Sequence, residues 1–423
     1  MASFGNTSGI AGRRLPGHGT WRAHAVQGLR AAPHAIAALP RGPVYVATDD
    51  GALHSLTPAG RVWWRVTTGE GTGEVRITPD GSAWLAVDDR RRLQEVRPDG
   101  TVGRKITPSH EIGEHIGMFL PLGHDFVIAW TSLSYDRVRI ERIDRDGKRR
   151  WSTAPPIEKI AFDGIASVEP KTGWRSEPTA PSTPALTIAH EPLLVSGNRL
   201  LVSYLDVLSG LTVAWCLRLS TGEIMWRPDP MPDGPRAAAA DGFLVGTSGY
   251  DAHHMFLHGH DGTVTADWNT CGQPLISSRG RIRILETSRP DGKPSRIHRL
   301  HRDGQKTTGG SLAAESPVAD PVLSSDGRAA FWRDGGLHTV DHHLTLRTRL
   351  PLPDRNARGR MLLLDTGTLV FIVESRDSQT TDLIFVETNL SPLDPGAWPC
   401  GRGSLSGGYS RRHKASTALV STR

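Results

Sequence analysis

The sequence has few of the residues on which several common protein classes depend. Its 423 residues include only three cysteines, Cys216, Cys271 and Cys400, which are far apart and contain no C-x-x-C pair. This spacing excludes a disulfide framework and a cysteine zinc site, and it predicts buried thiols. No apolar run approaches the ~18–20 residues that cross a bilayer. We therefore expect no membrane-spanning helix and no membrane partner.

Lysine is also scarce. Only seven of the 50 basic residues are lysines, and 44 acidic residues leave a net charge of +6. The preference for arginine, together with much Ala, Gly and Pro, is typical of a high-GC genome such as an actinobacterial one, rather than of a selected basic surface. The basic runs are short and separate, and no aromatic residues alternate repeatedly with them. We therefore predict no nucleic-acid partner.

Several signatures are missing as well. The first 21 residues, MASFGNTSGIAGRRLPGHGTW, carry Gly, Asn and Ser where a secretion signal has a continuous apolar stretch, and they offer no lipid-anchoring cysteine. This predicts a cytoplasmic protein. The sequence also lacks a phosphate-binding loop, a G-x-S-x-G elbow and a dinucleotide fingerprint, which argues against nucleotide-driven chemistry.

What the sequence does contain is an internal repeat. A unit of apolar strand, polar turn, alternating strand, glycine turn and third strand recurs at residues 44–66, 83–106, 125–151, 199–226, 242–268, 281–308, 327–350 and 368–390. A short expected strand precedes each unit, at 32–39, 75–79, 118–122, 186–196, 236–240, 274–277, 321–324 and 360–364. Each repeat therefore has four expected strands.

The turn glycines give the period. Gly60, Gly100, Gly147, Gly222, Gly262 and Gly304 follow one another at intervals of 40, 47, 75, 40 and 42 residues. Four-stranded propeller blades have a period of ~40–50 residues. We therefore predict an all-β chain folded as a single eight-bladed β-propeller with four antiparallel strands per blade. Seven blades is the alternative, because the unit at 327–350 is weak.

The expected domain runs over 18–403, with a long insertion at 154–185, and it leaves tails at 1–17 and 404–423. The closing blade is expected to join residues near Trp21 to the C-terminal unit around Trp398.

Tryptophan follows the turn glycine by four residues in three units, at Trp64, Trp151 and Trp226. An indole at this place can fill the wedge between adjacent sheets while its N–H reaches a backbone acceptor, so we predict a structural docking role. The pattern resembles the PQQ-like β-propeller repeat, and residues 219–226, LSTGEIMW, are close to that family's tryptophan-docking motif. The resemblance covers about residues 27–400. It implies the eight-bladed fold shared by quinoprotein alcohol dehydrogenases and outer-membrane assembly scaffolds.

The chain departs from the quinone-binding members of this family. It lacks their adjacent pair of cysteines, their calcium-site carboxylates and the haem-attachment C-x-x-C-H. Arg104 and Thr308 stand four residues after Gly100 and Gly304, where the motif has Trp. We therefore predict no PQQ and no resident cofactor, and leave a divalent metal open.

If each unit runs from an inner to an outer strand, one face carries two kinds of loop. These are the connections between units and the turns between the second and third strands. We call it the loop-bearing face. Its turns hold phenols and carboxylates that are candidate ligand-binding groups, with capping of the local turn as the alternative. The candidates are Tyr135, Tyr204, Tyr250 and Asp251.

Two histidine-rich stretches supply candidate catalytic groups. In residues 110–115, HEIGEH, His110, Glu111 and His115 form the densest cluster of acid–base side chains, although the spacing fits no zinc-protease signature. Residues 250–261 contain His253, which on a strand lies opposite the other histidines of that stretch. A metal there would need a histidine from another unit, such as His190.

The insertion at 154–185 is rich in Pro, Thr and Ser and falls on the loop-bearing face. A loop of this length is often a lid or a binding segment. As a lid it would bring Trp174 and Arg175 over the central mouth, to cover an apolar or anionic ligand; as a plain insertion it would have no role.

Two functions remain open. One is a binding scaffold that holds a protein or peptide partner through the loop-bearing face. The other is a cofactor-independent or metal-assisted enzyme of bacterial specialised metabolism, such as a lyase, cyclase or isomerase, with its active site at the central mouth. Convergence of the candidate histidines in one deep pocket distinguishes the second from the first.

Overall fold

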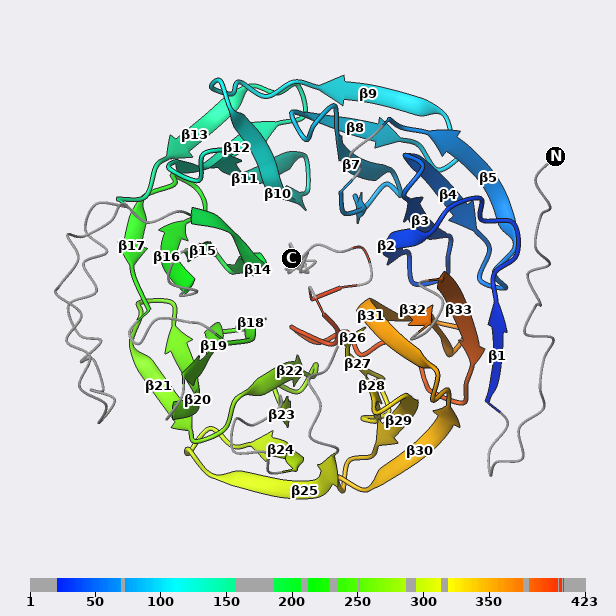
Figure 1. Ribbon diagram of the computed structural model, residues 1–423. Coiled ribbons are helices and arrows are strands. Elements are labelled where there is room, and N and C mark those ends of the chain that lie inside the picture. Colours follow the sequence, from blue (N-terminus) through cyan, green and yellow to red (C-terminus); the bar gives the residue numbers. More distant parts are fainter. Residues whose placement is uncertain are drawn as a thin grey trace, which may run out of the picture.

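Eight antiparallel sheets stand around a central axis and form an eight-bladed β-propeller (Figure 1). This computed structural model describes residues 21–69, 73–156, 186–206, 212–228, 234–249, 252–286, 294–312, 319–375, 380–401, 403, 404 and 406. In this part of the chain no helix is long and apolar enough to cross a membrane. The all-β, eight-bladed prediction is confirmed, and the weak unit at 327–350 supplies three strands of blade 7.

Blades 1 to 4 follow the chain from the innermost to the outermost strand. Blade 1 is β2 (Pro33–Ala38), β3 (Val44–Thr48), β4 (Ala52–Leu56) and β5 (Val62–Thr67). Blade 2 is β6 (Arg76–Ile77), β7 (Ala83–Val87), β8 (Arg92–Val96) and β9 (Val102–Ile106). Blade 3 is β10 (Glu114–Leu122), β11 (Asp125–Ser132), β12 (Val138–Asp144) and β13 (Arg149–Thr153). Blade 4 is β14 (Leu186–Ser196), β15 (Arg199–Asp206), β16 (Thr212–Arg218) and β17 (Ile224–Trp226).

Blades 5 to 8 continue the ring. Blade 5 is β18 (Arg236–Ala239), β19 (Gly242–Gly249), β20 (Ala252–Gly259) and β21 (Val264–Trp268). Blade 6 is β22 (Gly272–Ile276), β23 (Ile282–Glu286), β24 (Ser295–Leu300) and β25 (Lys306–Leu312). Blade 7 is β27 (Val322–Leu323), β28 (Ala329–Arg333), β29 (Gly336–Val340) and β30 (Leu346–Pro351). Blade 8 is β31 (Arg355–Leu363), β32 (Thr368–Ser375), β33 (Thr381–Glu387) and β1 (Arg22–Ala25), with β26 (Ala319–Asp320) parallel to β31.

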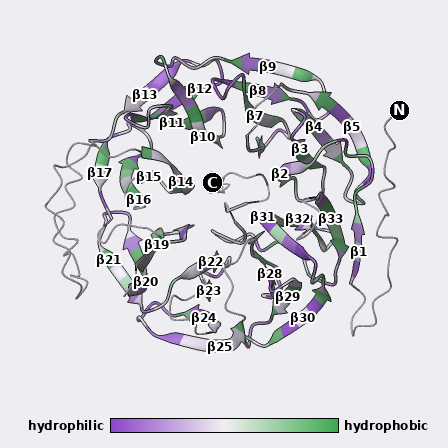
Figure 2. Ribbon diagram, viewed as in Figure 1, coloured by the Kyte–Doolittle hydropathy of each residue, from purple (hydrophilic) through white to green (hydrophobic). Residues whose placement is uncertain are grey.

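The middle strands are apolar on both faces because each blade packs against two neighbours. Every residue of β3 (VYVAT), β7 (AWLAV) and β28 (AAFWR) is buried. The outermost strands are mostly exposed, and β9, β13 and β25 carry hydrophilic stretches (Figure 2). Alternation of apolar and polar residues is therefore clear only at the rim of the ring. The predicted burial of Cys216, Cys271 and Cys400 is also confirmed.

Tryptophan from one blade packs on the turn glycine of the next. Trp151 Nε1 donates to the carbonyl of Leu219 at 3.0 Å, and a Cβ on Gly222 would lie 2.5 Å from the indole. Trp64 and Trp226 make the same contact with the following blade, donating to Pro98 and His260. Trp268, two residues later in its repeat, also reaches the next blade and donates to His301 at 2.9 Å. Within the described residues, four of the eight interfaces between blades therefore use an indole donor.

The ring is closed by the N-terminal strand. β1 pairs antiparallel with β33, from Arg22 opposite Glu387 to Ala25 opposite Ile384. Trp21 donates to the Asn389 side chain at 3.2 Å. The closing strand near Trp21 is therefore as expected, but its partner strand is Thr381–Glu387 and not the segment around Trp398. Trp398 lies elsewhere because its backbone pairs with Ile276 in blade 6.

The chain after β33 enters the centre of the ring, where Figure 1 shows its last coloured part in red. We call the described residues 393–401, 403, 404 and 406 the channel segment. Its backbone forms isolated bridges with blades 6 and 7: Leu393 with Ser324, Trp398 with Ile276, and Cys400 with Val322. Further along, the Ser404 carbonyl accepts from Arg360 of blade 8, and the Ser406 carbonyl accepts from the Ile77 N–H of blade 2 at 3.0 Å. Residues that the sequence placed at the start of a tail thus contact the inner strands.

Candidate functional site

Asp50 and Asp88, two carboxylates of the loop-bearing face, are held by side chains of their own blades. Asp50 accepts from Thr48 at 2.6 Å and from Arg65 at 2.8 Å, and Asp88 accepts from Lys105 and Arg92, both at 3.0 Å. The hydrogen bond from Thr48 lowers the pKa of Asp50, and the one from Lys105 lowers the pKa of Asp88. Both carboxylates are therefore already engaged by side chains of the protein. Among the described residues, no three His, Cys, Asp or Glu side chains are arranged to hold a metal ion.

The candidate catalytic residues of blade 3 each have a different partner. The His110 ring stacks on Trp130 with centroids 5.9 Å apart, and its Nδ1 lies 3.1 Å from the Pro108 carbonyl. Glu111 pairs with Arg137. His115 lies on β10, where burial lowers the pKa of its imidazole, with a smaller contribution from Arg90 and Arg91. The structure therefore does not bring His110, Glu111 and His115 into one acid–base group.

A buried ion network lies beneath the loops of blade 3. Arg139 binds Glu114 and Glu141, each at 2.7 Å, and also lies 5.0 Å from the centre of the Trp130 ring. The Glu114 carboxylate accepts the Glu111 backbone N–H at 2.8 Å. Burial alone would raise the pKa of Glu114, but hydrogen bonds from Arg139 and from the Glu111 backbone outweigh it, so this pKa lies below its usual value. The network fixes the connection that precedes β10.

Glu114→Gln is expected to lower the free energy of unfolding at pH 7, and to lower it less as the pH falls. Since the pKa of Glu114 is lowered on folding, its contribution is fully present above its usual pKa of 4.5 and is lost as pH falls through the folded value. Breaking a buried pair costs roughly 3–5 kcal/mol, and we expect about 2–4 at pH 7 because Arg139 keeps Glu141. Urea unfolding at pH 7, 5 and 3.5 measures this. The control Glu223→Gln removes an exposed pair with Arg218, and we expect it to change the free energy of unfolding little. A loss of stability in Glu114→Gln that is the same at all three pH values would contradict the role given to Glu114.

The remaining candidate histidines lie in other blades. His253 is half-buried on β20, the third strand of blade 5, and pairs across the sheet with Ser248. One blade separates it from His110 and His115, and it is two strands away from the central channel. His190 lies on β14 of blade 4, with its side chain outside the described residues. The candidate ligand residues Tyr250, Asp251, Trp174 and Arg175 also lie outside the described residues.

The two remaining candidate tyrosines have opposite environments. Tyr204 is fully buried in blade 4, and its hydroxyl donates to the carbonyls of Trp130 and Arg139 in blade 3, both at 3.3 Å. Burial raises its pKa strongly. The expectation that Tyr204 binds a ligand is therefore corrected: its hydroxyl joins two blades and does not reach solvent. Tyr135 lies on the surface of blade 3 with a φ of +58°.

Blade 3 carries an apolar patch that the sequence analysis did not single out. Seven large apolar side chains are exposed in the described residues, and three of them, Ile112 (95%), Leu133 (67%) and Tyr135 (43%), share the loop-bearing face of this blade. The Leu133 N–H donates to the Gly113 carbonyl at 3.0 Å, which joins the two loops. We call these three residues the blade 3 patch. Its sequence signal is an apolar residue inside each of the polar loops HEIGEH and TSLSYD.

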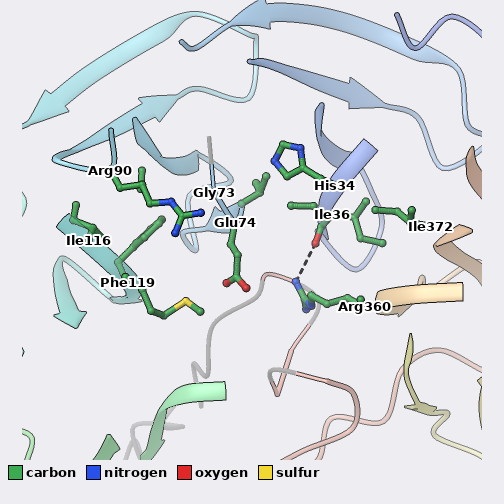
Figure 3. A pocket seen from close by; sticks show the side chains of 15 residues that line it. His34, Ile36, Gly73, Glu74, Arg90, Ile116, Phe119, Arg360 and Ile372 are labelled. Carbon is green, nitrogen blue, oxygen red and sulfur yellow. Dashed lines mark hydrogen bonds between the residues drawn. The ribbon is translucent and has the colours of Figure 1, made fainter. Parts of the chain in front are cut away.

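A cavity of about 280 Å³ lies at the channel mouth, between the inner strands of blades 1, 2, 3 and 8 (Figure 3). Its charged lining comprises Glu74, Arg90 and Arg360, with His34 beside them. Ile36, Ile116, Met118, Phe119 and Ile372 supply much of its apolar wall. Sequence reasoning missed it because Arg90 belongs to one of the short basic runs, residues 90–92, to which we gave no binding role, and because the cavity is lined from several separate parts of the chain.

Neither a protein-family model nor a curated protein sequence matches the chain. Solved structures do match it. BamB from Moraxella catarrhalis superposes with a TM-score of 0.54 at 13% identity, covering 86% of this chain and 99% of that one. The Dos1 propeller gives 0.52 at 8% identity, covering 87% and 89%. What they share with this chain is the β-propeller fold.

Virginiamycin B lyase from Staphylococcus aureus is also similar, with a TM-score of 0.47, 12% identity and coverage of 88% and 99%. At these identities the likeness concerns architecture alone, and the site must be argued from the residues of this chain.

Proposed function

We propose that the protein is a non-catalytic binding scaffold that holds a protein or peptide partner on its loop-bearing face, centred on the blade 3 patch. The supporting observation is the gathering of Ile112, Leu133 and Tyr135 on two joined loops. Exposed apolar side chains that occur singly need no explanation, but a contiguous group with a polar rim is typical of an interaction site.

The charges around the patch indicate the kind of partner. Glu111 pairs with Arg137, and the Asp136 carboxylate accepts from Ser132 at 2.7 Å and Ser134 at 2.5 Å. Their hydrogen bonds are satisfied locally, and together Glu111, Asp136 and Arg137 carry one net negative charge. We infer that the partner offers a short segment with apolar side chains, which the patch would contact at its centre while the polar groups form the rim.

The patch is also held rigidly. The Glu111 N–H is bound by the buried Glu114 carboxylate, which Arg139 holds, and Arg137 contacts the Ile112 carbonyl at 3.3 Å. Tyr135 stays in the left-handed region, which is costly for a bulky residue and is found more often at functional sites. A loop that is already ordered loses less entropy on binding.

The residues present do not fit a quinone of the kind that the PQQ-like resemblance implies. The three cysteines are buried and lie in different parts of the fold, so they offer no adjacent pair, and the described carboxylates form no metal-holding group. The packing of Trp64, Trp151 and Trp226 on turn glycines nevertheless supports a relationship to the PQQ-like repeat. The enzymatic alternative and the cytoplasmic location stay predictions.

A co-purification experiment with matched variants tests the scaffold proposal. Affinity-tagged protein is isolated gently from its own host as wild type, as Ile112→Asp/Leu133→Asp, and as Val264→Asp, and each sample is analysed by native mass spectrometry. Val264 is 48% exposed on the outer strand β21 of blade 5, so it controls for the loss of an apolar surface residue.

We expect a stoichiometric polypeptide with the wild type and with Val264→Asp, and its loss from the double variant. Removing a central apolar contact costs more than ~1 kcal/mol, so each Asp substitution should weaken the complex by about fivefold or more. No stoichiometric polypeptide, or equal retention by the double variant, would exclude the patch as the binding site.

A further inference from the structure

The cavity at the channel mouth has the features of a small-ligand site. Glu74 belongs to the connection before β6 and Arg90 to the turn between β7 and β8, so the cavity lies at the loop-bearing end of the channel. Its volume of about 280 Å³ is at the small end of ligand pockets, which commonly measure about 300–1,000 Å³. It lies on blades 1, 2, 3 and 8 and does not depend on the blade 3 patch.

The turn that carries Arg90 is strained. Asp88, Asp89 and Arg90 have φ values of 53°, 54° and 60°, and these three consecutive residues are half of the six described non-glycine residues with positive φ. An L-residue in this region costs roughly 1–2 kcal/mol. Such strain persists only when the surroundings enforce it, and it is concentrated at binding and active sites.

Identifiable contacts hold this turn in place. The Arg90 carbonyl accepts the Ile116 N–H of blade 3 at 2.7 Å, and the Arg91 N–H donates to the Val87 and Asp88 carbonyls, both at 3.1 Å. The Asp88 carboxylate is bound by Lys105 and Arg92. Arg91 and Arg92 line a separate surface hollow, whereas Arg90 lines the cavity, and Figure 3 shows its side chain reaching into it.

The Arg90 guanidinium is available to a ligand. Within the described part of the chain it makes no hydrogen bond or ion pair through its side chain, and a Cβ on Gly73 would lie 3.9 Å from its Nε. Glu74, the acidic residue of the described lining, is paired with the buried Arg76. Arg360 lies across the cavity, where it donates to the Ile36 carbonyl at 3.1 Å (Figure 3).

We infer that this cavity binds a small apolar carboxylic acid, with the carboxylate on Arg90 and the apolar body against Ile116, Met118 and Phe119. A planar guanidinium matches a carboxylate through two parallel N–H donors. The wall offers aliphatic, thioether and aromatic contacts to the rest of the ligand. Inorganic phosphate has no apolar body to contact this wall, so we expect it to bind more weakly than such an acid.

The channel segment limits the length of the ligand. Arg360, which lines the cavity, also donates to the Ser404 carbonyl, and the next contact of the segment is on Ile77 of β6. The segment therefore crosses the channel beside the cavity. A ligand with a long alkyl chain would have to extend down the channel past this segment. We therefore infer that the ligand is a compact acid.

Calorimetric titration of the full chain with butyrate, hexanoate and phenylacetate tests this inference, with hexanamide and inorganic phosphate as comparison ligands at equal ionic strength. The variants are Arg90→Gln and the matched control Arg91→Gln, the neighbouring arginine that lines the other hollow. Thermal unfolding of each variant checks that the fold is retained.

We expect at least one acid to bind the wild type, to bind Arg90→Gln at least tenfold more weakly, and to bind Arg91→Gln within twofold of wild type. Absence of binding by all three acids would overturn the inference. Equal weakening by both variants, or equally tight binding of hexanamide or phosphate, would also overturn it. None of these outcomes affects the co-purification test, which concerns residues of the blade 3 patch.

Discussion

Gly222→Ala is expected to lower the free energy of unfolding by about 3 kcal/mol, because two costs combine at this turn. Gly222 has a φ of +76°, which a side chain opposes, and a new Cβ would lie 2.5 Å from the Trp151 ring. The indole cannot retreat easily, because its N–H is bound to the Leu219 carbonyl. Equilibrium urea unfolding measures the change.

A matched glycine separates the two costs. Gly280 has a φ of +70° with nothing within 4 Å of a new Cβ, so Gly280→Ala reports backbone strain alone, about 1 kcal/mol. In a Trp151→Ala background, itself about 3–5 kcal/mol less stable, Gly222→Ala should cost clearly less than in the wild type. It should still cost more than Gly280→Ala, because the Thr153 Oγ1 atom would remain 2.7 Å from the new Cβ. If the cost of Gly222→Ala is the same with and without the indole, the docking contact is not what holds blades 3 and 4 together.

Removal of β1 is expected to lower the free energy of unfolding by about 4 kcal/mol or more. Exposing two apolar side chains costs about this much, and the hydrogen bonds between β1 and β33 are lost as well. The comparison is between a chain that starts at Trp21 and one that starts at Leu29, so that the difference measures the strand itself. Without β1 the edge of β33 is open, and an open edge pairs with other chains. We therefore also expect self-association, seen by light scattering after size exclusion.

Rescue in trans gives the control for this prediction. A synthetic peptide of residues 21–28 should restore the melting temperature of the shortened chain, whereas the same peptide with His24→Pro should not, because proline removes a donor from the ladder. A shortened chain that stays monomeric and unfolds at the same urea concentration as the longer one would show that closure by β1 contributes little.

The strands of the propeller were predictable because they are specified locally. The alternation of the outer strands and the turn glycines act within a few residues, and glycines such as Gly60 and Gly100 do have positive φ. The same applies to the docking tryptophans, whose spacing from the glycine places the indole on a fixed face. Each inner strand was also expected, because a short apolar segment precedes every unit.

The candidate site was far less predictable. The blade 3 patch depends on the backbone contact between Leu133 and Gly113, which joins two loops, and the mouth cavity depends on residues from four blades. Tyr204 and Tyr135 look alike in the sequence, since both precede an aspartate near a strand end, yet one is buried between blades and the other is exposed. Inter-blade packing decides such outcomes, and no local pattern encodes it.

The pairing of the two ends of the chain also sets an order of events during synthesis. Trp21 and its partner Asn389 are separated by 368 residues. At translation rates of about 5–20 residues per second, β1 waits roughly 20–70 s on the ribosome before β33 emerges. During that interval the nascent blades have no closed ring to join, and the channel segment, made later still, is among the last parts of the described chain to reach its place.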